Sequence, residues 1–500
     1  MSGTTDDPNV QPQLRRDSLG LPELVFHAVT HIAPATSVVL MLPTIAQHAG
    51  PAMPISLLLS TIVCLSIGST VYEFSRYVPS SGSYYSFATR GLGSRAGFVA
   101  TWSYLIYEII GAAACIGFIG YLLSDMLGAA FHISIPWWLL AVAMNSLIWW
   151  LTHRGVRISA RVTALLGGAE LLIMLALGVT FLVHPGRGSS YVAPLTPASS
   201  PTHFEGILAG MVFSILALSG FESPAPLAQE ARLPSRSIGR AIMASLIVVG
   251  SFYIFMAYAS AIGWGTSDME GFASNPNPFY ALGHSLWGAR WWFVVLAIVN
   301  SAIGTGIAST NVASRVMYTM GRAGTLPSAF GRVHAVHQTP ATAIAISQIL
   351  GMIAILLVGL LLRPEYIFAF LGTVATLAII VLYVMANLAL TPYMHREQRP
   401  RFAVWRHVLL PGLATLVLLP VLFVTVYPTP AWPYNLTPYI FAVLLASGFG
   451  YMQWREWRTP GALQNAAMMV IRGSETKLPS TERPQSIANR GQSRELLETE

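Results

Sequence analysis

Apolar runs of about 20 residues, the length that crosses the roughly 30 Å hydrocarbon core of a bilayer, recur in this chain from Glu23 to Glu456. Hydrophobic residues make up 54% of the 500 residues and charged residues only 10%, too few charges to cover a soluble protein of this size. We therefore expect an all-α integral membrane protein with roughly twelve transmembrane helices. The expected spans begin near Leu24, Pro54, Gly97, Pro136, Val162, Phe204, Ala241, Trp291, Ala341, Ile367, Val408 and Pro438.

Arginines are concentrated in alternate connections between these spans. The positive-inside rule places such connections in the cytoplasm, and both termini then lie on the same side. The net charge of +7 reflects this topology and does not indicate nucleic-acid binding, because the arginines sit at helix ends. The intervening connections contain Arg187, Arg290 and Arg363. The arginine-rich connections contain Arg76, Arg90, Arg95, Arg154, Arg157, Arg161, Arg232, Arg236, Arg240, Arg315, Arg322, Arg332, Arg396, Arg399, Arg401 and Arg406.

Two hydrophobic segments are interrupted at corresponding places in the two halves of the chain. One is His31–Ser37 and the other is Leu218–Ser223. Pro34 removes a helical donor and Gly220 weakens a helix, so backbone groups are left unpaired at a depth where lipid cannot satisfy them. Paired interruptions of this kind are typical of secondary transporters built from inverted repeats, which hold substrate at the bilayer midplane. Ordinary Pro and Gly kinks are the alternative.

A broken helix presents two opposite helix ends at one depth. Amides at a helix N-terminus attract a carboxylate, and carbonyls at a C-terminus attract an ammonium group. We expect the carboxylate of a zwitterion near Thr36 and its amine at carbonyls near Ile32 and Ser219, with Phe221 closing over the substrate as a gate. The predicted substrate site comprises Ile32, Ala33, Ala35, Thr36, Ser37, Ser219, Gly220, Phe221 and Glu222.

Acidic residues within the spans are few. A charge at mid-bilayer costs about 3 kcal/mol or more, so such a residue normally faces a cavity, pairs, or takes up a proton. Glu108, Glu170 and Glu222 are the candidates for a proton site; Glu170 is favoured, with a structural hydrogen-bonded acid as the alternative. Glu222 either meets a substrate amine or braces the interruption. Glu73 and Glu230 lie near the cytoplasmic ends, where we expect them to pair with arginines.

Other polar side chains in the spans leave the coupling ion open. Ser309 and Thr310 offer hydroxyls that can complete a sodium site, although ordinary helix-to-helix hydrogen bonding explains them equally well. His27 and His31 share one helical face, a spacing able to hold a metal, but no third ligand is evident. We expect hydrogen-bonded packing for both histidines and no metal site, and we prefer proton over sodium coupling.

Three sequence blocks resemble the amino acid-polyamine-organocation permeases. They follow one another in the order found in that family, which makes the resemblance specific up to about Pro392. The resemblance implies two inverted five-helix repeats with broken first and sixth helices, the LeuT-like arrangement, plus two extra helices. Some proton-coupled members have a lysine in the fifth helix, where this chain has Glu170. The blocks are Tyr72–Tyr85 with Arg90–Gly93, Gly220–Ser223 with Gln229–Ala241, and Ser314–Tyr318 with Gly321–Pro327 and Thr339–Pro340.

The expected organisation has four parts. Residues 1–20 form a disordered cytoplasmic tail rich in polar residues. Residues 21–392 form the transport core, with repeats at about 21–185 and 203–392, and residues 393–456 form the two extra helices. Residues 457–500 form a cytoplasmic tail. Lys477 is the only lysine among many arginines, a composition typical of a GC-rich bacterial genome, so we expect a multi-pass protein of the bacterial inner membrane.

These observations predict a secondary active transporter that imports an amino acid across the plasma membrane by alternating access, as a proton symporter. A polyamine or other organic-amine transporter, or an amino acid exchanger, is the alternative within the same fold, and a membrane sensor is the alternative from another class. An enzyme is not expected, because no nucleophile, base or metal ligands converge in the sequence. The expected partners are an amino acid, the coupling ion (H⁺ or Na⁺) and lipid, with no cofactor and no nucleic acid.

Overall fold

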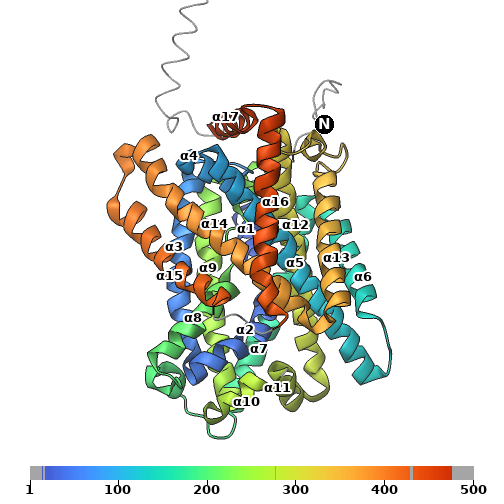
Figure 1. Ribbon diagram of the computed structural model, residues 1–500. Helices are drawn as coiled ribbons and strands as arrows, with labels where there is room; N and C mark the ends of the chain where they lie inside the picture. Colours follow the sequence, from blue (N-terminus) through green and yellow to red (C-terminus); the bar gives the residue numbers. More distant parts are fainter. Residues whose placement is uncertain (1–13, 15–16, 276, 428–431, 476–500) are drawn as a thin grey trace, which may run out of the picture.

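Helices fill most of the described part of the chain, as expected for the all-α class. The computed structural model describes residues 14, 17–275, 277–427 and 432–475. Within these ranges no β-strand forms, and the β-type pairing is an isolated bridge between Leu19 and Ala231. Most of the long helices run side by side through the molecule (Figure 1).

The helices follow the positions of the expected spans. Helices of 17 residues (α6) and 15 residues (α8) lie over the fourth and sixth expected spans. In chain order the helices are α1 (Leu21–His31), α2 (Pro34–Ala49), α3 (Met53–Tyr77), α4 (Tyr84–Leu92), α5 (Ser94–Phe131), α6 (Trp137–His153), α7 (Val156–Val183), α8 (Phe204–Leu218), α9 (Pro234–Trp264), α10 (Met269–Ser274), α11 (Pro278–Trp287), α12 (Trp292–Arg322), α13 (Ala341–Leu361), α14 (Ile367–Glu397), α15 (Leu410–Val426), α16 (Thr437–Arg458) and α17 (Ala462–Glu475).

Among the described residues, 8 helical stretches are long and apolar enough to cross a membrane. This number is below the expected one for identifiable reasons. The stretch Leu21–Tyr77 contains the first two expected spans together, and α6 and α8 are shorter than 18 residues. Helix α16, at the twelfth expected span, is long enough at 22 residues but is not among the eight stretches. The multi-pass architecture is therefore clear, and the arrangement of twelve spans in inverted repeats stays a prediction.

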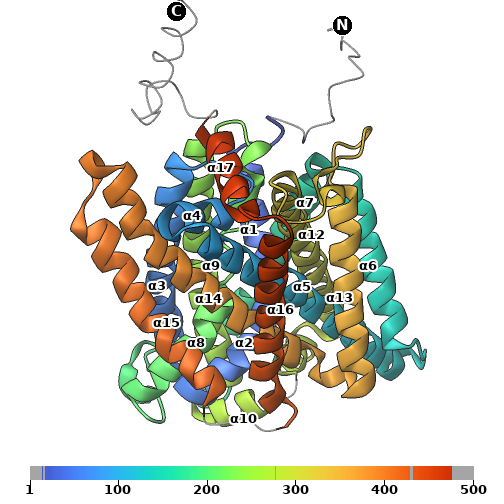
Figure 2. The ribbon, with the colours of Figure 1, turned by 45° about the horizontal axis from the view of Figure 1, so that its top comes forward.

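The two expected interruptions are present in the backbone. Helix α1 ends at His31 and α2 begins at Pro34, with Ala33 between them in the left-handed region at φ 57°. Helix α8 ends at Leu218, and after an irregular stretch the chain forms a 3₁₀ turn at Ala225–Gln229. Helix α1 packs against α7, α9 and α12, and α2 packs against α8, so both interruptions are enclosed by other helices (Figure 2).

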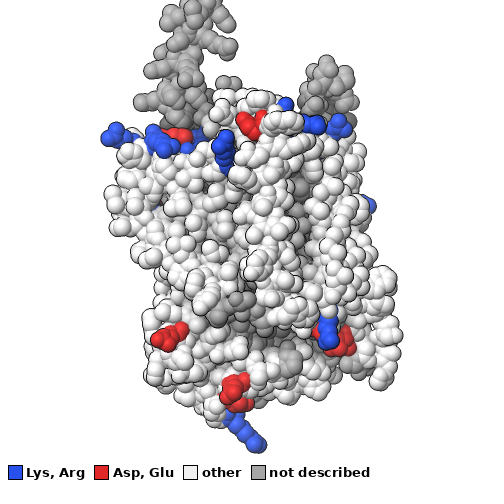
Figure 3. Space-filling view, viewed as in Figure 1, with Lys and Arg blue, Asp and Glu red and all other residues white. Residues whose placement is uncertain are grey.

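Arginine side chains gather at one end of the molecule, which we call the arginine-rich end. The described chain begins and finishes near this end, and Figure 3 shows most of the visible basic side chains there. The 3₁₀ turn after α8 also lies toward it, whereas α2, α8 and α10 extend toward the opposite end (Figures 1 and 2). The alternation of arginine in the sequence thus corresponds to a polarity of the fold.

A buried ion pair lies at the arginine-rich end. Arg315 of α12 donates through Nε and Nη2 to the two carboxylate oxygens of Glu230, at 3.0 and 3.1 Å. The segment before α1 lies against the same turn, because the amides of Ser18 and Leu19 both donate to the Glu230 carbonyl. The pairing of Glu230 with an arginine is confirmed, as is that of Glu73, which contacts Arg406 at 2.6 Å.

The two predicted tails are only partly described. Residues 1–13, 15–16 and 476–500 lie outside the described ranges. Part of the predicted C-terminal tail is helical, because α17 spans Ala462–Glu475 and buries Leu463 and Ala466. Sequence composition averaged over the tail concealed this short amphipathic helix, which packs against α4, α5 and α16.

Candidate functional site

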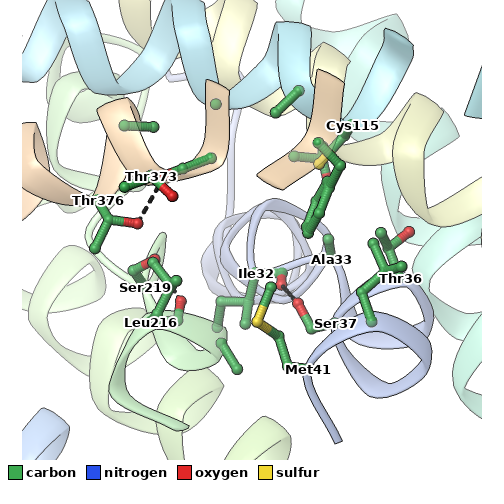
Figure 4. Close-up of a pocket in the computed structure, with 18 of the residues that line it drawn as sticks. Ile32, Ala33, Thr36, Ser37, Met41, Cys115, Leu216, Ser219, Thr373 and Thr376 are labelled. Carbon is green, nitrogen blue, oxygen red and sulfur yellow. Dashed lines mark hydrogen bonds between the residues drawn. The ribbon is translucent and has the colours of Figure 1, made fainter. Parts of the chain in front are cut away.

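A cavity of about 360 Å³ lies beside both interruptions. Its volume falls within the roughly 300–1,000 Å³ typical of small-molecule sites. Helices α1, α2 and α8 border it on one side, and α5, α12 and α14 complete the wall. Figure 4 shows Ile32, Ala33, Thr36 and Ser37 at the first interruption and Ser219 at the second. The structure thus brings five predicted substrate-site residues to one cavity.

Apolar side chains make up most of the cavity wall. No Asp, Glu, Lys or Arg is found among the described residues that line it. The polar groups are the imidazole of His31, the hydroxyl of Tyr107, and several Ser and Thr hydroxyls. The apolar lining comprises Ile32, Leu40, Met41, Ala114, Phe213, Leu216, Ala217, Phe368, Ala369 and Ala375.

Opposite helix ends meet at this cavity. The N-terminus of α2 carries a partial positive charge and the C-terminus of α8 a partial negative charge. In this conformation the Thr36 amide donates to the Ser301 hydroxyl at 3.3 Å, and the Ser37 amide donates to the Ala33 carbonyl. The Ser37 hydroxyl donates to the Ile32 carbonyl at 3.0 Å. The Thr36 and Ser37 amides are therefore engaged within the protein, and a carboxylate would have to displace these bonds to reach them.

The remaining predicted substrate residues lie behind the cavity wall. Ala35 and Gly220 are not among the lining residues. Phe221 is fully buried and stacks on Tyr383, with ring centroids 5.4 Å apart, so it does not cover the cavity in this conformation. Glu222 is also buried, and its Oε2 accepts from the Tyr383 hydroxyl at 2.7 Å and from the Gly220 amide at 3.2 Å. Glu222 thus braces the second interruption.

His31 links the two interruptions directly. It is the last residue of α1, and its Nδ1 lies 2.8 Å from the Gly220 carbonyl oxygen. Its Nε2 lies 3.0 Å from Oε2 of Glu108 and 2.8 Å from the Ser309 hydroxyl. Sequence analysis predicted hydrogen-bonded packing for this histidine, and these contacts agree with that description. What the sequence missed is that its partners are groups on three other segments of the chain.

The carboxylate of Glu170, favoured from sequence as the proton site, is not part of the cavity. It lies in α7, which packs against α1, α9 and α12. It is fully buried, and neither of its oxygens has a hydrogen-bond partner among the described groups.

The two hydroxyls proposed for a cation site have different surroundings. Ser309 lines the cavity and contacts His31. Thr310 lines a much smaller space between α5, α6, α12 and α13, together with Glu108 and with Ser309 itself. Its hydroxyl donates to the Gly306 carbonyl and receives the amide of Gln348. Glu108 and Ser309 therefore belong to one cluster with His31, whereas Thr310 belongs to the adjoining helix contact.

His31, Glu108 and Glu222 offer ligand atoms that all lie within 4.8 Å of one another. One nitrogen and two carboxylate oxygens at this separation are a donor set that a divalent cation accepts. The sequence around His27 and His31 offers no third ligand. The acids come from α5 and from the segment after α8, so no spacing in the sequence could have indicated the group.

Comparison with known proteins agrees with this geometry. The branched-chain amino acid permease BcaP of Bacillus subtilis is 26% identical over 412 residues, covering 76% of this chain and 82% of the relative. The low-affinity putrescine importer PlaP of Escherichia coli is 28% identical over 320 residues, covering 62% of this chain and 67% of the relative. The glutamate/serine transporter AimA of B. subtilis is 26% identical over 341 residues, covering 62% of this chain and 60% of the relative. The amino acid permease family model matches residues 24–450, and the chain therefore belongs to the amino acid permease family.

Proposed function

We propose that this permease imports a zwitterionic amino acid with an apolar side chain by alternating access, driven by protons. The observation that supports this proposal is the meeting of a positive and a negative helix end at one cavity with apolar walls. The α2 end suits a carboxylate, the α8 end suits an ammonium group, and the walls suit a side chain without charge.

The lining argues against a polyamine. A diamine carries a second ammonium group, and a buried charge without a partner is costly. Nothing acidic lines the described wall of the cavity to receive it. One relative is described as a branched-chain amino acid permease and another as a putrescine importer. The apolar wall favours the former substrate class for this chain.

The polarity of the fold supports import. If the arginine-rich end is cytoplasmic, as the positive-inside rule requires, both termini are cytoplasmic. The cavity follows α2 from Ile32 to Thr44, away from the arginine-rich end. On the arginine-rich side of the interruptions, Arg315 and Glu230 form a buried ion pair. This conformation would then receive substrate from outside the cell, and opening of the Arg315 contact would release it inside.

The surroundings of Ser309 and Thr310 favour protons over sodium. A sodium site needs oxygen lone pairs directed at one point. The Thr310 hydroxyl is already used by Gly306 and Gln348, and the Ser309 hydroxyl faces a ring nitrogen of His31. The buried titratable groups at the cavity instead offer places for an exchangeable proton.

The test is uptake of a panel of radiolabelled amino acids, polyamines and simple amines into proteoliposomes. An inward pH gradient, an inward sodium gradient and no gradient are compared. We expect the pH gradient to drive accumulation of branched or otherwise apolar amino acids, whereas putrescine is not transported. Transport of amines that lack a carboxylate would instead assign the chain to the organic-amine carriers. Absence of flux for every compound would favour a sensor.

A further inference from the structure

We propose that His31 and Glu108 together hold the coupling proton, and that His31 connects its presence to both helix interruptions. This inference rests on the proposed function, because it assigns a residue pair to the proton that drives transport. It moves the proton site from Glu170, which the sequence favoured, to a pair in contact with the cavity. His31 lines the cavity, and Glu108 lies directly behind it.

The hydrogen bonds of the imidazole define where a proton can bind. A carbonyl oxygen only accepts, so the 2.8 Å contact with Gly220 requires the hydrogen to be on Nδ1 of His31. The second nitrogen, Nε2, is then the position that gains or loses a proton. With the proton present, Nε2 and Glu108 Oε2 share it across 3.0 Å.

Ser309 allows the same arrangement to exist without the proton. Its hydroxyl lies 2.8 Å from Nε2 and can either donate to the free lone pair or accept from the N–H. The loss of the proton therefore leaves Nε2 with a partner, but it leaves the carboxylate of Glu108 buried beside a neutral ring. Glu108 Oε1 has no hydrogen-bond partner among the described groups. An unpaired buried charge opposes closure of the cavity, because closure removes the remaining water.

Several other groups surround this pair, and they set its electrostatic balance. Glu222 is the nearest second acid, and its Oε2 is held by Tyr383 and by the Gly220 amide. Arg315 of α12 is engaged by Glu230 rather than by this pair. With both acids ionised and the ring neutral, the cluster carries two negative charges. The titratable groups around it are His27 of α1, Tyr104 and Tyr107 of α5, Glu222 after α8, Arg315 of α12, Tyr84 of α4 and Tyr383 of α14.

These contacts suggest how the proton and the substrate act together. The proton neutralises Glu108, and the substrate ammonium at the end of α8 brings a second positive charge close to the cluster. Both must be present before the cavity closes, because together they offset the two negative charges of the cluster, while the N-terminus of α2 receives the substrate carboxylate. Because His31 ends α1 and bonds Gly220, the same imidazole transmits this condition to the two segments that must rearrange.

The experiment compares Glu108→Gln and His31→Gln with Glu170→Gln in proteoliposomes. Substrate counterflow without a gradient measures binding and exchange. Accumulation driven by a pH gradient, and proton uptake on substrate addition to protein in weakly buffered detergent, measure coupling. We expect Glu108→Gln to keep counterflow but lose accumulation and substrate-linked proton uptake, while Glu170→Gln keeps all three. His31→Gln should lose counterflow as well, because it removes the contact with Gly220 and leaves Glu108 buried without its partner. Coupled accumulation by Glu108→Gln, or its loss in Glu170→Gln alone, would overturn the assignment.

Ser309→Ala provides a second test if the two glutamine variants do not fold. Ser309→Ala removes the hydroxyl that serves both protonation states, so we expect the pH profile of accumulation to shift. An unchanged profile contradicts the inference.

Metal analysis of the purified protein, with and without EDTA, tests whether a metal ion occupies the cluster of His31, Glu108 and Glu222 instead of a proton. A stoichiometric metal ion that is absent from Glu108→Gln would overturn the proton assignment.

Two outcomes with the wild-type protein distinguish failure of this inference from failure of the proposed function. A wild type without counterflow for any amino acid contradicts the proposed function itself. A wild type that exchanges an amino acid but never accumulates it under a pH gradient leaves amino acid transport intact and overturns the assignment of a coupling proton.

Discussion

Arg315 and Glu230 form a two-point ion pair that is fully buried at the arginine-rich end. The third guanidinium nitrogen donates to Asn311 Oδ1 and to the Ser314 hydroxyl, both at 3.0 Å, so the arginine is fixed along α12. The Glu230 backbone carbonyl accepts the amides of Ser18 and Leu19. One contact therefore joins α12, the turn after α8 and the segment before α1.

We expect Glu230→Gln to destabilise the protein strongly, because it leaves Arg315 buried without a counter-charge. Removal of one partner of a buried pair typically costs about 3–5 kcal/mol. The matched control is Arg363→Gln. Arg363 and Glu365 also form a pair, but both side chains are largely exposed, and such pairs contribute about 0–1 kcal/mol.

Thermal unfolding in detergent measures this difference. The Glu230→Gln midpoint should fall well below that of the wild type, and the Arg363→Gln midpoint should stay close to it. Equal midpoints for the two variants would show that the buried pair does not hold this end closed.

Gly220 has a backbone conformation that only glycine adopts easily, with φ at 106°. A Cβ atom there would lie 2.9 Å from Nδ1 of His31 and 3.2 Å from the His31 carbonyl oxygen. We expect Gly220→Ala to abolish transport, because the methyl group displaces the imidazole from its hydrogen bond. Gly324→Ala is the control: its φ is also positive, at 76°, but nothing lies within 4 Å of the added carbon.

Both substitutions carry the backbone penalty of about 1–2 kcal/mol for a left-handed L-residue. Uptake assays with purified, monodisperse protein therefore isolate the contact with His31. Comparable uptake by the two alanine variants would contradict a functional role for that contact.

The sequence predicted helix type and helix position well, because both depend on local properties. Long apolar runs, Pro34 and the Gly220 region were sufficient to locate the long helices and the interruptions. The partners of His31 could not be predicted in this way. Glu108 and Ser309 are 77 and 278 residues away from it in the chain, and only tertiary packing brings them together. The spacing of His27 and His31 indicates which face of the helix is buried, but it does not identify the residues that pack against this face.

The direction of the Phe221 side chain is another property that could not be predicted from the sequence. Its place beside Gly220 suggested an aromatic gate, but the irregular segment turns the side chain toward Tyr383. The direction of a side chain in an unwound segment depends on each backbone dihedral, and no periodic pattern specifies these angles. Its role as a gate stays a prediction for a different conformation of the protein.

Cys115 gives a direct probe of the cavity. It lines the wall, whereas Cys64 is fully buried and is not among the lining residues. We expect a small thiol-reactive methanethiosulfonate to inhibit transport by modifying Cys115, and a transported amino acid to slow this reaction by occupying the cavity. Cys115→Ala should resist inhibition, and Cys64→Ala should remain sensitive.

Mass spectrometry of the labelled protein identifies the modified residue. Protection of Cys115 by substrate supports occupancy of this cavity. Inhibition that persists in Cys115→Ala, or labelling that substrate does not slow, would place the substrate elsewhere.

The apolar wall near Leu40 should determine which side chains are accepted. Leu40 lines the cavity six residues after Pro34, about 9 Å along α2 from the interruption. An amino acid held at the interruption would extend its side chain in this direction. We expect Leu40→Asp to reduce uptake of apolar amino acids and to create recognition of lysine or ornithine, because the carboxylate supplies the missing partner for a second ammonium group. Leu40→Asn is the matched control, since asparagine has almost the same shape as aspartate without the charge.

Competition assays against labelled substrate distinguish the two variants. Both should lose affinity for apolar amino acids, and only the aspartate variant should be inhibited by lysine. Inhibition of the wild type by lysine or putrescine would show that the apolar wall does not exclude a second cationic group.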